Sequence, residues 1–494
     1  MGFTFLFQKR LLSEVKKPIG VSFLFMKIFK PLINLDSYDT FIKERLQKGT
    51  PSAYRFGKRY GIVIQDNEVI YPASIQHMFG FVRNVIISLC ENYKHGRIQV
   101  LWIKKDIDND GPQVTKKLPN EKDDYRQLII LNRVDHLIHL LVTRCIKERL
   151  NQDKQLIPVK SRIKNIQVTS ALLKKAFLQE WTYYYSTDIK KFGESFDLEK
   201  AKNTLLRLLD KHIDTEDIVL INNLLSSYQK IPQHKSSGSP LNQLLAELTL
   251  SQIEHEVVNR IPVPFVRSGE DFVFCLKDKN DYAKIEETLG SIIKDKAGDK
   301  CELHRAKQTS SIYDARYQVN FIFNTDNDKG FIGSFHDPGI DFCGFNYSIE
   351  NENIVVRIRY KTLNKIRERI KMYTEGGDFR TYNLPEEIPT NKKIKNIIRE
   401  LNSLFGFYFK NNEWHHSRLY GIHELFKLPS ELDSGQICNQ AQRLNHYMLR
   451  RLRHLHMRNI CNDSVLNARQ YREEIDKSYR KLGLRNLIDS IKCY

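Results

Sequence analysis

Apolar residues recur at helical spacing in several parts of the chain. Residues 128–149 place an apolar side chain every three or four positions, which predicts an amphipathic helix. The same period predicts helices over 198–210 and 240–258. The second of these follows Ser239 and begins with Pro240, which are a capping residue and a first-turn residue that favour a helix start. Long helices are therefore expected on both sides of residue 200.

Short β-prone runs alternate with these helices. The aromatic segment 181–189 predicts a strand, and two apolar runs between residues 263 and 276 flank a polar turn. Further strands are predicted at 315–323 and 340–359, the latter folded back on itself at residues 350–353. Because strands and helices share the middle of the chain, this part is expected to be an α+β core.

The chain divides into three predicted regions. Residues 1–174 form a helical N-terminal region, 175–370 form the mixed core, and 371–494 form an all-α domain that is rich in basic residues. No repeat period crosses these boundaries.

Charge suggests a class of partner. The 494 residues carry a formal net charge of +19, with basic residues spread along the whole length. A field of that sign attracts polyanions, so nucleic acid is the first candidate partner, against the alternative of a protein that is merely basic. The eight cysteines form no CxxC pair, which fits a reduced cytoplasm, and the apolar stretch 21–35 is too short and too interrupted to cross a membrane.

Three acidic residues stand at positions that suit metal binding. Asp188 ends the aromatic strand, and Glu270 and Asp271 lie in the turn between the two apolar runs. Nucleotidyl transfer uses two divalent metal ions held by carboxylates, which activate a hydroxyl and stabilise charge in the transition state. Spacing alone leaves the alternative of a solvated turn and a surface aspartate.

Five segments together resemble the motifs of reverse transcriptases. They occur in the order of that family and cover about the middle third of the chain: YYYSTDIKKFGESF at 183–196 resembles motif A, IPQHKSSGSPLNQLLAEL at 231–248 motif B, FVRSGEDFVF at 265–274 motif C, LHRAKQT at 303–309 motif D and IDFCGF at 340–345 motif E. Each is weak by itself, but five in order are specific.

The resemblance implies an RNA-directed DNA polymerase with a right-hand fold, whose fingers lie in 1–174, palm in 175–370 and thumb in 371–494. It implies two Mg²⁺ ions and deoxynucleoside triphosphate substrates. Asp188, Glu270 and Asp271 would be the metal ligands, together with the Ile189 carbonyl. Lys307 would approach the triphosphate and protonate the leaving pyrophosphate, against the alternative of a surface lysine.

The resemblance also implies a nucleotide and template path, lined by Phe192, Gly193, Pro232, Gln233, Gly238 and Ser268, with Gly344 shaping the grip on the primer. Three positions depart from the family pattern. Glu270 replaces an aspartate, Ser268 replaces a tyrosine, and Gly193 stands where a bulky residue usually excludes ribonucleotides. The longer Glu270 side chain puts catalytic geometry in doubt unless the backbone compensates.

The basic C-terminal region resembles that of bacterial abortive-infection and unknown-group reverse transcriptases, which act in phage defence. That resemblance, which extends to the class-9 defence-associated members, implies that the protein copies an associated non-coding RNA into DNA. Four arginines would contact RNA phosphates: Arg443, Arg450, Arg451 and Arg453. Some members prime synthesis from a tyrosine, which makes Tyr494 a candidate protein primer, although an ordinary terminal tyrosine is the simpler interpretation.

Two alternatives remain open at the level of sequence. The first is a catalytically silent polymerase fold that binds RNA as a scaffold, which the Glu270 substitution keeps in view. The second is template-independent nucleotide addition. The sequence leaves the oligomeric state open, including a homo-oligomer.

Overall fold

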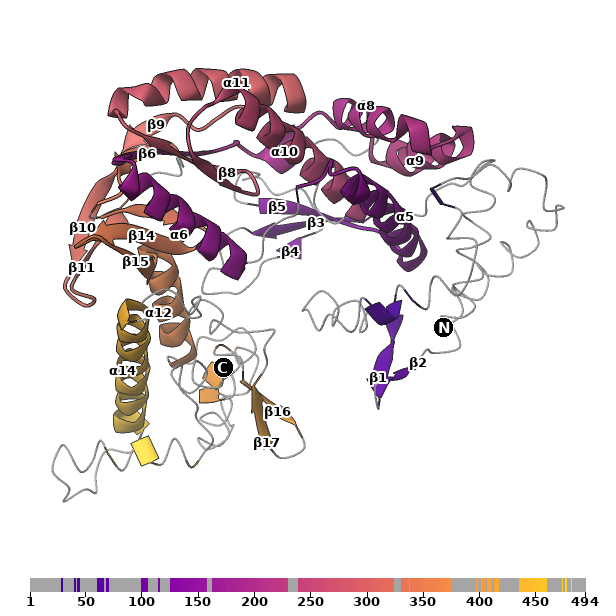
Figure 1. Cartoon of the computed structure of the whole chain (residues 1–494). Helices are drawn as coiled ribbons and strands as arrows, with labels where there is room; N and C mark the ends of the chain where they lie inside the picture. The colour runs from indigo at the N-terminus through magenta and orange to yellow at the C-terminus, as the bar shows by residue number, and fades with distance from the viewer. Residues whose placement is uncertain are drawn as a thin grey trace.

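The computed structural model describes most of the middle of the chain and shorter pieces toward both ends (Figure 1). The described residues are 28–29, 40, 42–44, 60–65, 68–70, 99–104, 114–115, 125–157, 162–229, 239–323, 330–336, 338–374, 397–398, 401–402, 404, 407–410, 413–416, 435–459, 473, 476–477 and 481.

A five-stranded sheet forms the centre of the fold, in the order β7-β8-β6-β12-β9. Its strands are β6 (Tyr183–Asp188), β7 (Phe265–Ser268), β8 (Asp271–Leu276), β9 (Ala306–Gln308) and β12 (Gly330–Ser334). Neighbouring strands are antiparallel except β9 and β12, which are parallel. Residues 272–276 of β8 are all buried, as expected for a strand covered on both faces.

Helices cover one face of this sheet (Figure 1). The helices α10 (Pro240–Arg260) and α11 (Tyr282–Ala297) lie along it. The helices α5 (Arg133–Gln152) and α8 (Leu198–Leu209) pack against α10, and α9 (Thr215–Gln229) adds side chains to the same hydrophobic cluster. Tyr185, Phe272 and Phe274 point from the sheet into the hydrophobic cluster that they share with these helices. Because side chains alternate along a strand, the neighbouring residues of β6 and β8 point the other way.

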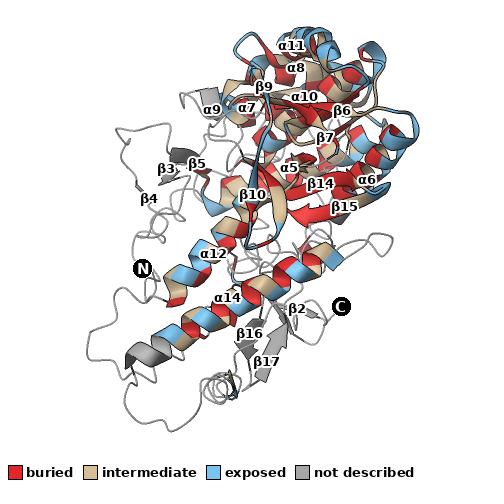
Figure 2. Ribbon diagram, turned by 90° about the vertical axis from the view of Figure 1, so that its left-hand side faces the viewer, coloured by how far each residue is buried: buried red, intermediate tan, exposed pale blue. Residues whose placement is uncertain are grey.

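The opposite face carries a second hydrophobic cluster, which includes Tyr184, Val273 and Cys275. The elements that share this cluster are α6 (Arg162–Leu178), β11 (Val319–Phe323), β13 (Ile340–Phe342), β14 (Phe345–Glu350), β15 (Asn353–Ile358), α12 (Tyr360–Thr374) and α14 (Gly435–Asn459). Figure 2 shows the buried side of α14 as a stripe along the helix. The chain is therefore a mixed α+β fold with apolar cores on both sides of the central sheet.

The remaining elements are short. They are β1 (Val63–Gln65), β2 (Glu68–Ile70), β3 (Gln99–Lys104), β4 (Val114–Thr115), β5 (Tyr125–Ile130), α7 (Phe192–Ser195), η4 (Asp210–His212), η5 (Lys279–Asp281), β10 (Ser310–Asp314), β16 (Phe407–Lys410) and β17 (Glu413–His416). None of the helices in these described stretches combines the length and the apolar composition that a membrane crossing requires.

Most predicted elements of the core are confirmed. The helices expected at 198–210 and 240–258 are α8 and α10, and the Ser239 hydroxyl accepts a hydrogen bond from the Asn242 amide at 3.3 Å. The aromatic strand is β6, and the hairpin predicted at 263–276 is β7–β8. The turn predicted at 350–353 joins β14 to β15.

Three predictions were wrong in part. The helix expected from 128 begins at Arg133, because residues 125–130 pair with β3 as a strand. The strand expected at 315–323 begins only at Val319, because residues 315–318 form the turn by which β11 pairs back onto β10. The C-terminal region is not all-α, because β16 and β17 pair as antiparallel strands from Phe407 with His416 to Lys410 with Glu413.

Gly339 occupies a position that only glycine fits. Its φ is +74°, and a Cβ there would overlap the carbonyl oxygen of Tyr347 in β14. We expect Gly339→Ala to lower the free energy of unfolding by about 3 kcal/mol, through overlap and a strained φ. As a control, Gly290→Ala in α11 meets open space and should raise stability by about 0.5–1 kcal/mol. Urea unfolding of both variants measures the difference, and equal midpoints would contradict the packing around Gly339.

Candidate active site

The ends of β6 and β8 bring two carboxylates together. Asp188 is the last residue of β6, Asp271 is the first of β8, and the two are directly paired across the antiparallel ladder. Paired residues point to the same face of a sheet with their Cβ atoms about 5 Å apart. Asp188 is 2% exposed and Asp271 is partly exposed. Two carboxyl groups therefore meet at the ends of two interior strands, where charge on both would cost free energy unless positive charge lies nearby.

Glu270 lies in the tight turn of the β7–β8 hairpin. Ser268 pairs with Asp271, so only Gly269 and Glu270 connect the strands. Gly269 has φ +62°, the left-handed conformation that glycine adopts in such turns. The Glu270 side chain is exposed. Glu270 is therefore adjacent to Asp271 in the chain, with its side chain open to solvent.

His304 makes a contact with Asp188 that the sequence did not indicate. Its Nε2 lies 3.2 Å from Asp188 Oδ1, and its backbone amide donates to the Asp188 carbonyl at 3.2 Å. The next residues continue this pairing, since Ile189 bridges to Leu303. The segment before β9 thus extends the sheet beside the end of β6, and it places an imidazole at the buried carboxylate.

The donor set suits magnesium only in part. Among the residues that the structure describes, no cluster of three or more His, Cys, Asp or Glu side chains is close enough to hold a metal ion. Mg²⁺ needs fewer protein ligands, since one or two carboxylates with phosphate oxygens and water complete its shell. Asp188 and Asp271 supply two carboxylates, with the Ile189 carbonyl next along the chain. These hard oxygen donors fit Mg²⁺, whereas Glu270 stands on the turn outside such a cluster.

The predicted nucleotide residues fall in different surroundings. Lys307 is exposed on β9, where it pairs with Phe331 of β12. Phe192 is 5% exposed and stacks on Phe196 with ring centroids 5.4 Å apart, and Gly193 follows it in α7. The Ser268 hydroxyl accepts a hydrogen bond from Asn165 at 3.0 Å. Pro232, Gln233, Gly238 and Tyr494 lie outside the described residues.

The four predicted RNA-binding arginines lie on α14. Arg450 is exposed. Arg443 donates to the carbonyl of Arg316 and to Gln318 Oε1, so it is engaged with the loop between β10 and β11. Arg451 Nε lies 3.5 Å from Thr374 Oγ1, and Arg453 pairs with Asp476 at 2.5 Å. Three of the four thus have protein partners, which leaves Arg450 as the member most open to a phosphate.

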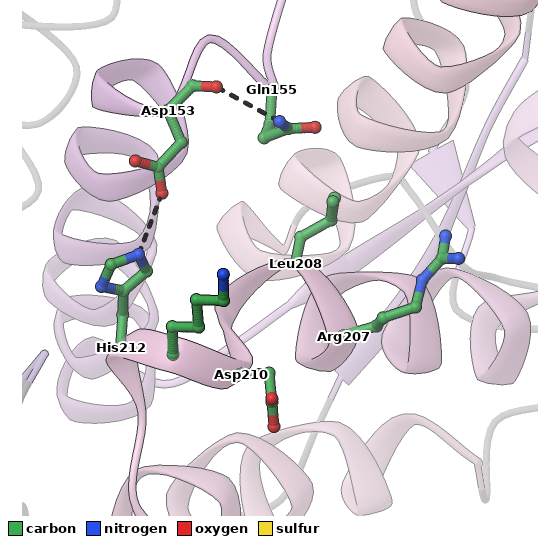
Figure 3. Close-up of a pocket in the computed structure, with 7 residues that line it drawn as sticks. Asp153, Gln155, Arg207, Leu208, Asp210 and His212 are labelled. Atoms are coloured by element: carbon green, nitrogen blue, oxygen red, sulfur yellow. Dashed lines mark hydrogen bonds and ion pairs between the residues drawn. The ribbon is translucent and has the colours of Figure 1, made fainter.

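A separate pocket of about 330 Å³ lies at the C-terminal ends of α5 and α8 (Figure 3). It is lined by Asp153, Gln155, Arg207, Leu208, Asp210, Lys211 and His212, so it contains none of the predicted site residues. His212 Nε2 lies 3.4 Å from Asp153 Oδ2 within it.

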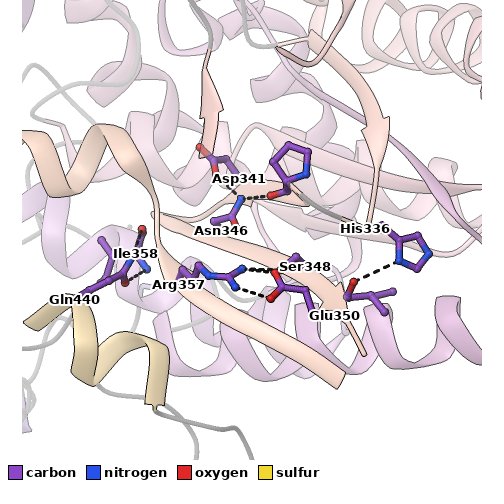
Figure 4. Close-up of polar contacts among 10 residues, drawn as sticks. His336, Asp341, Asn346, Ser348, Glu350, Arg357, Ile358 and Gln440 are labelled. Carbon is purple, nitrogen blue, oxygen red and sulfur yellow. Dashed lines mark hydrogen bonds and ion pairs between the residues drawn. The ribbon is translucent and has the colours of Figure 1, made fainter. Parts of the chain in front are cut away.

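Polar contacts lie within the three-stranded sheet β13-β14-β15 and join its strand β15 to α14 (Figure 4). The Arg357 guanidinium binds both carboxylate oxygens of Glu350 at 2.6 Å and the Ser348 hydroxyl at 2.8 Å. Although burial alone would raise it, the pKa of Glu350 lies below its ordinary value because of the bonds from Arg357 and Ser348. Gln440 of α14 accepts from the Ile358 amide at 2.8 Å and donates to its carbonyl at 3.2 Å.

Gly344 lies in the turn between β13 and β14, with φ +90°, and Asp341 of β13 pairs with Asn346 of β14 across this hairpin. Burial raises the pKa of Asp341 to about 6, against the opposing effects of a hydrogen bond from Asn346 and the charge of Arg359. The folded state therefore binds a proton between about pH 4 and 6 that the unfolded chain lacks, so the unfolding free energy falls as pH rises through this window.

Asp341→Asn should remove this fall. The full shift of about two pKa units is worth about 3 kcal/mol, and partial exposure of the residue reduces the expected gain to about 1–2 kcal/mol. We expect the variant to match the wild type near pH 4 and to exceed it at pH 7, because asparagine still accepts from Asn346. Urea midpoints at pH 4, 5.5 and 7 test this, with the exposed Asp299→Asn as control. A variant less stable at pH 7 would contradict it.

Comparison with known proteins assigns no family. No protein-family model matches the chain, and no curated protein sequence matches it. Among solved structures, the chain is similar to a telomerase from Candida albicans in complex with the TWJ fragment of telomeric RNA, with a TM-score of 0.31 and 11% identity. The match covers 74% of this chain and 64% of that one, so the chain spans less than two thirds of the telomerase. A similarity at this score carries no argument about function.

Proposed function

We propose that the chain is an RNA-directed DNA polymerase that copies an associated non-coding RNA, acts in antiphage defence and uses two Mg²⁺ ions. The observation that carries the proposal is the direct pairing of Asp188 with Asp271 at the ends of β6 and β8. This pairing joins two residues that are far apart in the sequence and belong to the segments that resemble motifs A and C.

The chain's own residues have distinct parts in this proposal. Asp188 and Asp271 would hold Mg²⁺, which when bound stabilises the charge that develops on the transferred phosphate. Glu270 would reach the same centre from the turn. Lys307, exposed on β9, would neutralise and protonate the leaving pyrophosphate. The net charge of +19 would retain the template and product strands.

Other parts of the proposal rest on the sequence resemblance alone. They are the fingers, palm and thumb within 1–174, 175–370 and 371–494, the non-coding RNA template, the role in phage defence, and protein priming from Tyr494. The proposed cytoplasmic location rests on the scattered cysteines. A catalytically silent RNA-binding scaffold is the second candidate, and the position of Glu270 on the exposed side of the turn is the observation that favours it.

Incorporation of each labelled deoxynucleotide by the purified protein, with its co-purified RNA and Mg²⁺, tests the proposal. We expect labelled polymer that depends on the bound RNA, so that RNase treatment before the reaction abolishes it. A product that shifts on protease treatment in the wild type but not in Tyr494→Phe would support protein priming. Synthesis of unchanged composition after RNase points to template-independent addition. RNA retention without incorporation points to the scaffold.

A further inference from the structure

A buried ion pair attaches the turn that carries Glu270 and Asp271 to α10. Arg267, two residues before the turn glycine, is 7% exposed although it is charged. Its Nε lies 2.5 Å from Glu254 Oε2 on α10, and its Nη1 donates to the Gly269 carbonyl at 2.8 Å. One guanidinium therefore joins the middle of α10 to the turn itself.

The other face of the hairpin has its own attachment. Ser268 points to the same face as Asp271 and Asp188, because the three are paired across the strands. Its hydroxyl accepts a hydrogen bond from Asn165 of α6, which is itself buried. The turn is thus fixed between α10 on one face and α6 on the other.

Burying an ion pair beneath a hairpin carries a large desolvation cost. Apolar residues of similar size would stabilise the same interior equally well or better, because they carry no desolvation cost. What an apolar pair cannot supply is the hydrogen bond from Arg267 to the Gly269 carbonyl. The pair therefore determines where the turn lies, rather than how stable the core is.

We infer that Arg267 and Glu254 are positioning residues, which fix the β7–β8 turn and with it the backbone of Glu270 and Asp271 beside Asp188. This inference rests on the proposed function. The fixed turn supplies a backbone position that matches the extra methylene of glutamate. That position matters because a displacement of about 1 Å in a catalytic group can cost about a hundredfold in rate. Neither residue contacts the reacting groups itself.

Two variants separate positioning from stability. In Arg267→Lys the charge can still pair with Glu254, but the compact ammonium lacks the planar fork whose Nε and Nη1 reach Glu254 and the Gly269 carbonyl at the same time. The double variant Glu254→Met/Arg267→Met replaces the charges with apolar side chains of similar volume. The matched control is Lys147→Met/Glu247→Met, which removes a different ion pair, 2.5 Å long, between α5 and the same helix α10.

The readouts are kcat and KM for the deoxynucleotide, the unfolding temperature, and hydrogen exchange of the peptide spanning residues 265–276. We expect both Arg267 variants to lose about ten- to a hundredfold in kcat with little change in KM, and to exchange faster at the turn. The control should stay within about twofold of the wild type. Glu254→Gln, which keeps an acceptor for Arg267, should retain more activity than Arg267→Lys.

Wild-type kcat and wild-type exchange in Arg267→Lys would overturn the inference. If the double variant fails to fold, Arg267→Lys still decides. If the wild type itself incorporates no nucleotide, the proposed polymerase function has failed. Hydrogen exchange at the turn then still shows whether Arg267 fixes it.

Discussion

Asp188→Asn is expected to abolish deoxynucleotide incorporation, by at least about a thousandfold, while leaving the fold intact. The substitution removes one of the two paired carboxylates but keeps their shape, so the loss measures charge directed at the metal ions. A thousandfold loss corresponds to about 4 kcal/mol of transition-state stabilisation, which is reasonable for a principal metal ligand.

The same substitution should not lower stability. Asp188 and Asp271 are carboxyl groups at directly opposed positions, so removing one relieves their repulsion, and the asparagine oxygen can still accept from His304 Nε2. We therefore expect an unfolding temperature equal to or above that of the wild type, together with retained RNA. Loss of activity with a gain of stability indicates a residue kept for function rather than for folding.

Asp281→Asn provides the matched control. Asp281 is exposed at the start of α11 and makes no capping hydrogen bond through its side chain. Incorporation by this variant should stay close to the wild-type rate. If Asp188→Asn also incorporates nucleotide at that rate, the paired aspartates do not hold the catalytic metal ions, and the proposed function must be abandoned.

Sequence patterns predicted the core best where local signals agreed with burial. The strand β6 is aromatic throughout its first half, and α10 carries both its cap and its proline. The boundary of α5 was missed because the apolar residues of β5 run directly into its helical pattern. The signal that marks this boundary is Asn132, whose side chain accepts from the Asp135 amide at 2.8 Å as a helix cap.

The hairpin β10–β11 was missed for a different reason. Its turn contains no glycine, proline or asparagine, the residues by which turns are usually recognised. Asp314 makes the turn instead, by accepting from the backbone amide of Arg316 at 2.8 Å while its carboxylate binds the Arg316 guanidinium. A local bond of this kind can be found in a sequence only after the turn is suspected.

The residues of the candidate site also differ in whether the sequence could predict them. Asp188 and Asp271 were predictable from sequence because each lies in a motif-like segment at one end of a strand, and the structure then pairs those two strands in register. His304, Asn165 and Glu254 come from other elements, and only the tertiary fold brings them to the site. Arg267 did carry a signal, since a charged residue at an inward position of an apolar strand needs a buried partner.

Glu270 provides the second large effect, because it tests whether the turn is adapted to glutamate. Gly269 takes a positive φ, and Arg267 and Asn165 hold the turn from opposite faces, so the backbone cannot easily follow a shorter side chain. Glu270→Asp would withdraw the carboxylate by about one methylene. We therefore expect it to lose about ten- to a hundredfold in kcat, although aspartate is the residue that the resembled family carries.

Comparison with Glu270→Gln identifies the cause. Glutamine keeps the length of the side chain and removes its charge. If Glu270 binds metal, Glu270→Gln should lose about as much kcat as Glu270→Asp, and higher Mg²⁺ should restore less of that loss than in Glu270→Asp. Single-turnover rates across a Mg²⁺ series measure both. A faster Glu270→Asp enzyme would mean that the turn is placed for aspartate and that glutamate weakens the enzyme. Wild-type rates in both variants would leave Asp188 and Asp271 as the only metal-binding carboxylates of the three, which matches the exposed position of Glu270 on the turn.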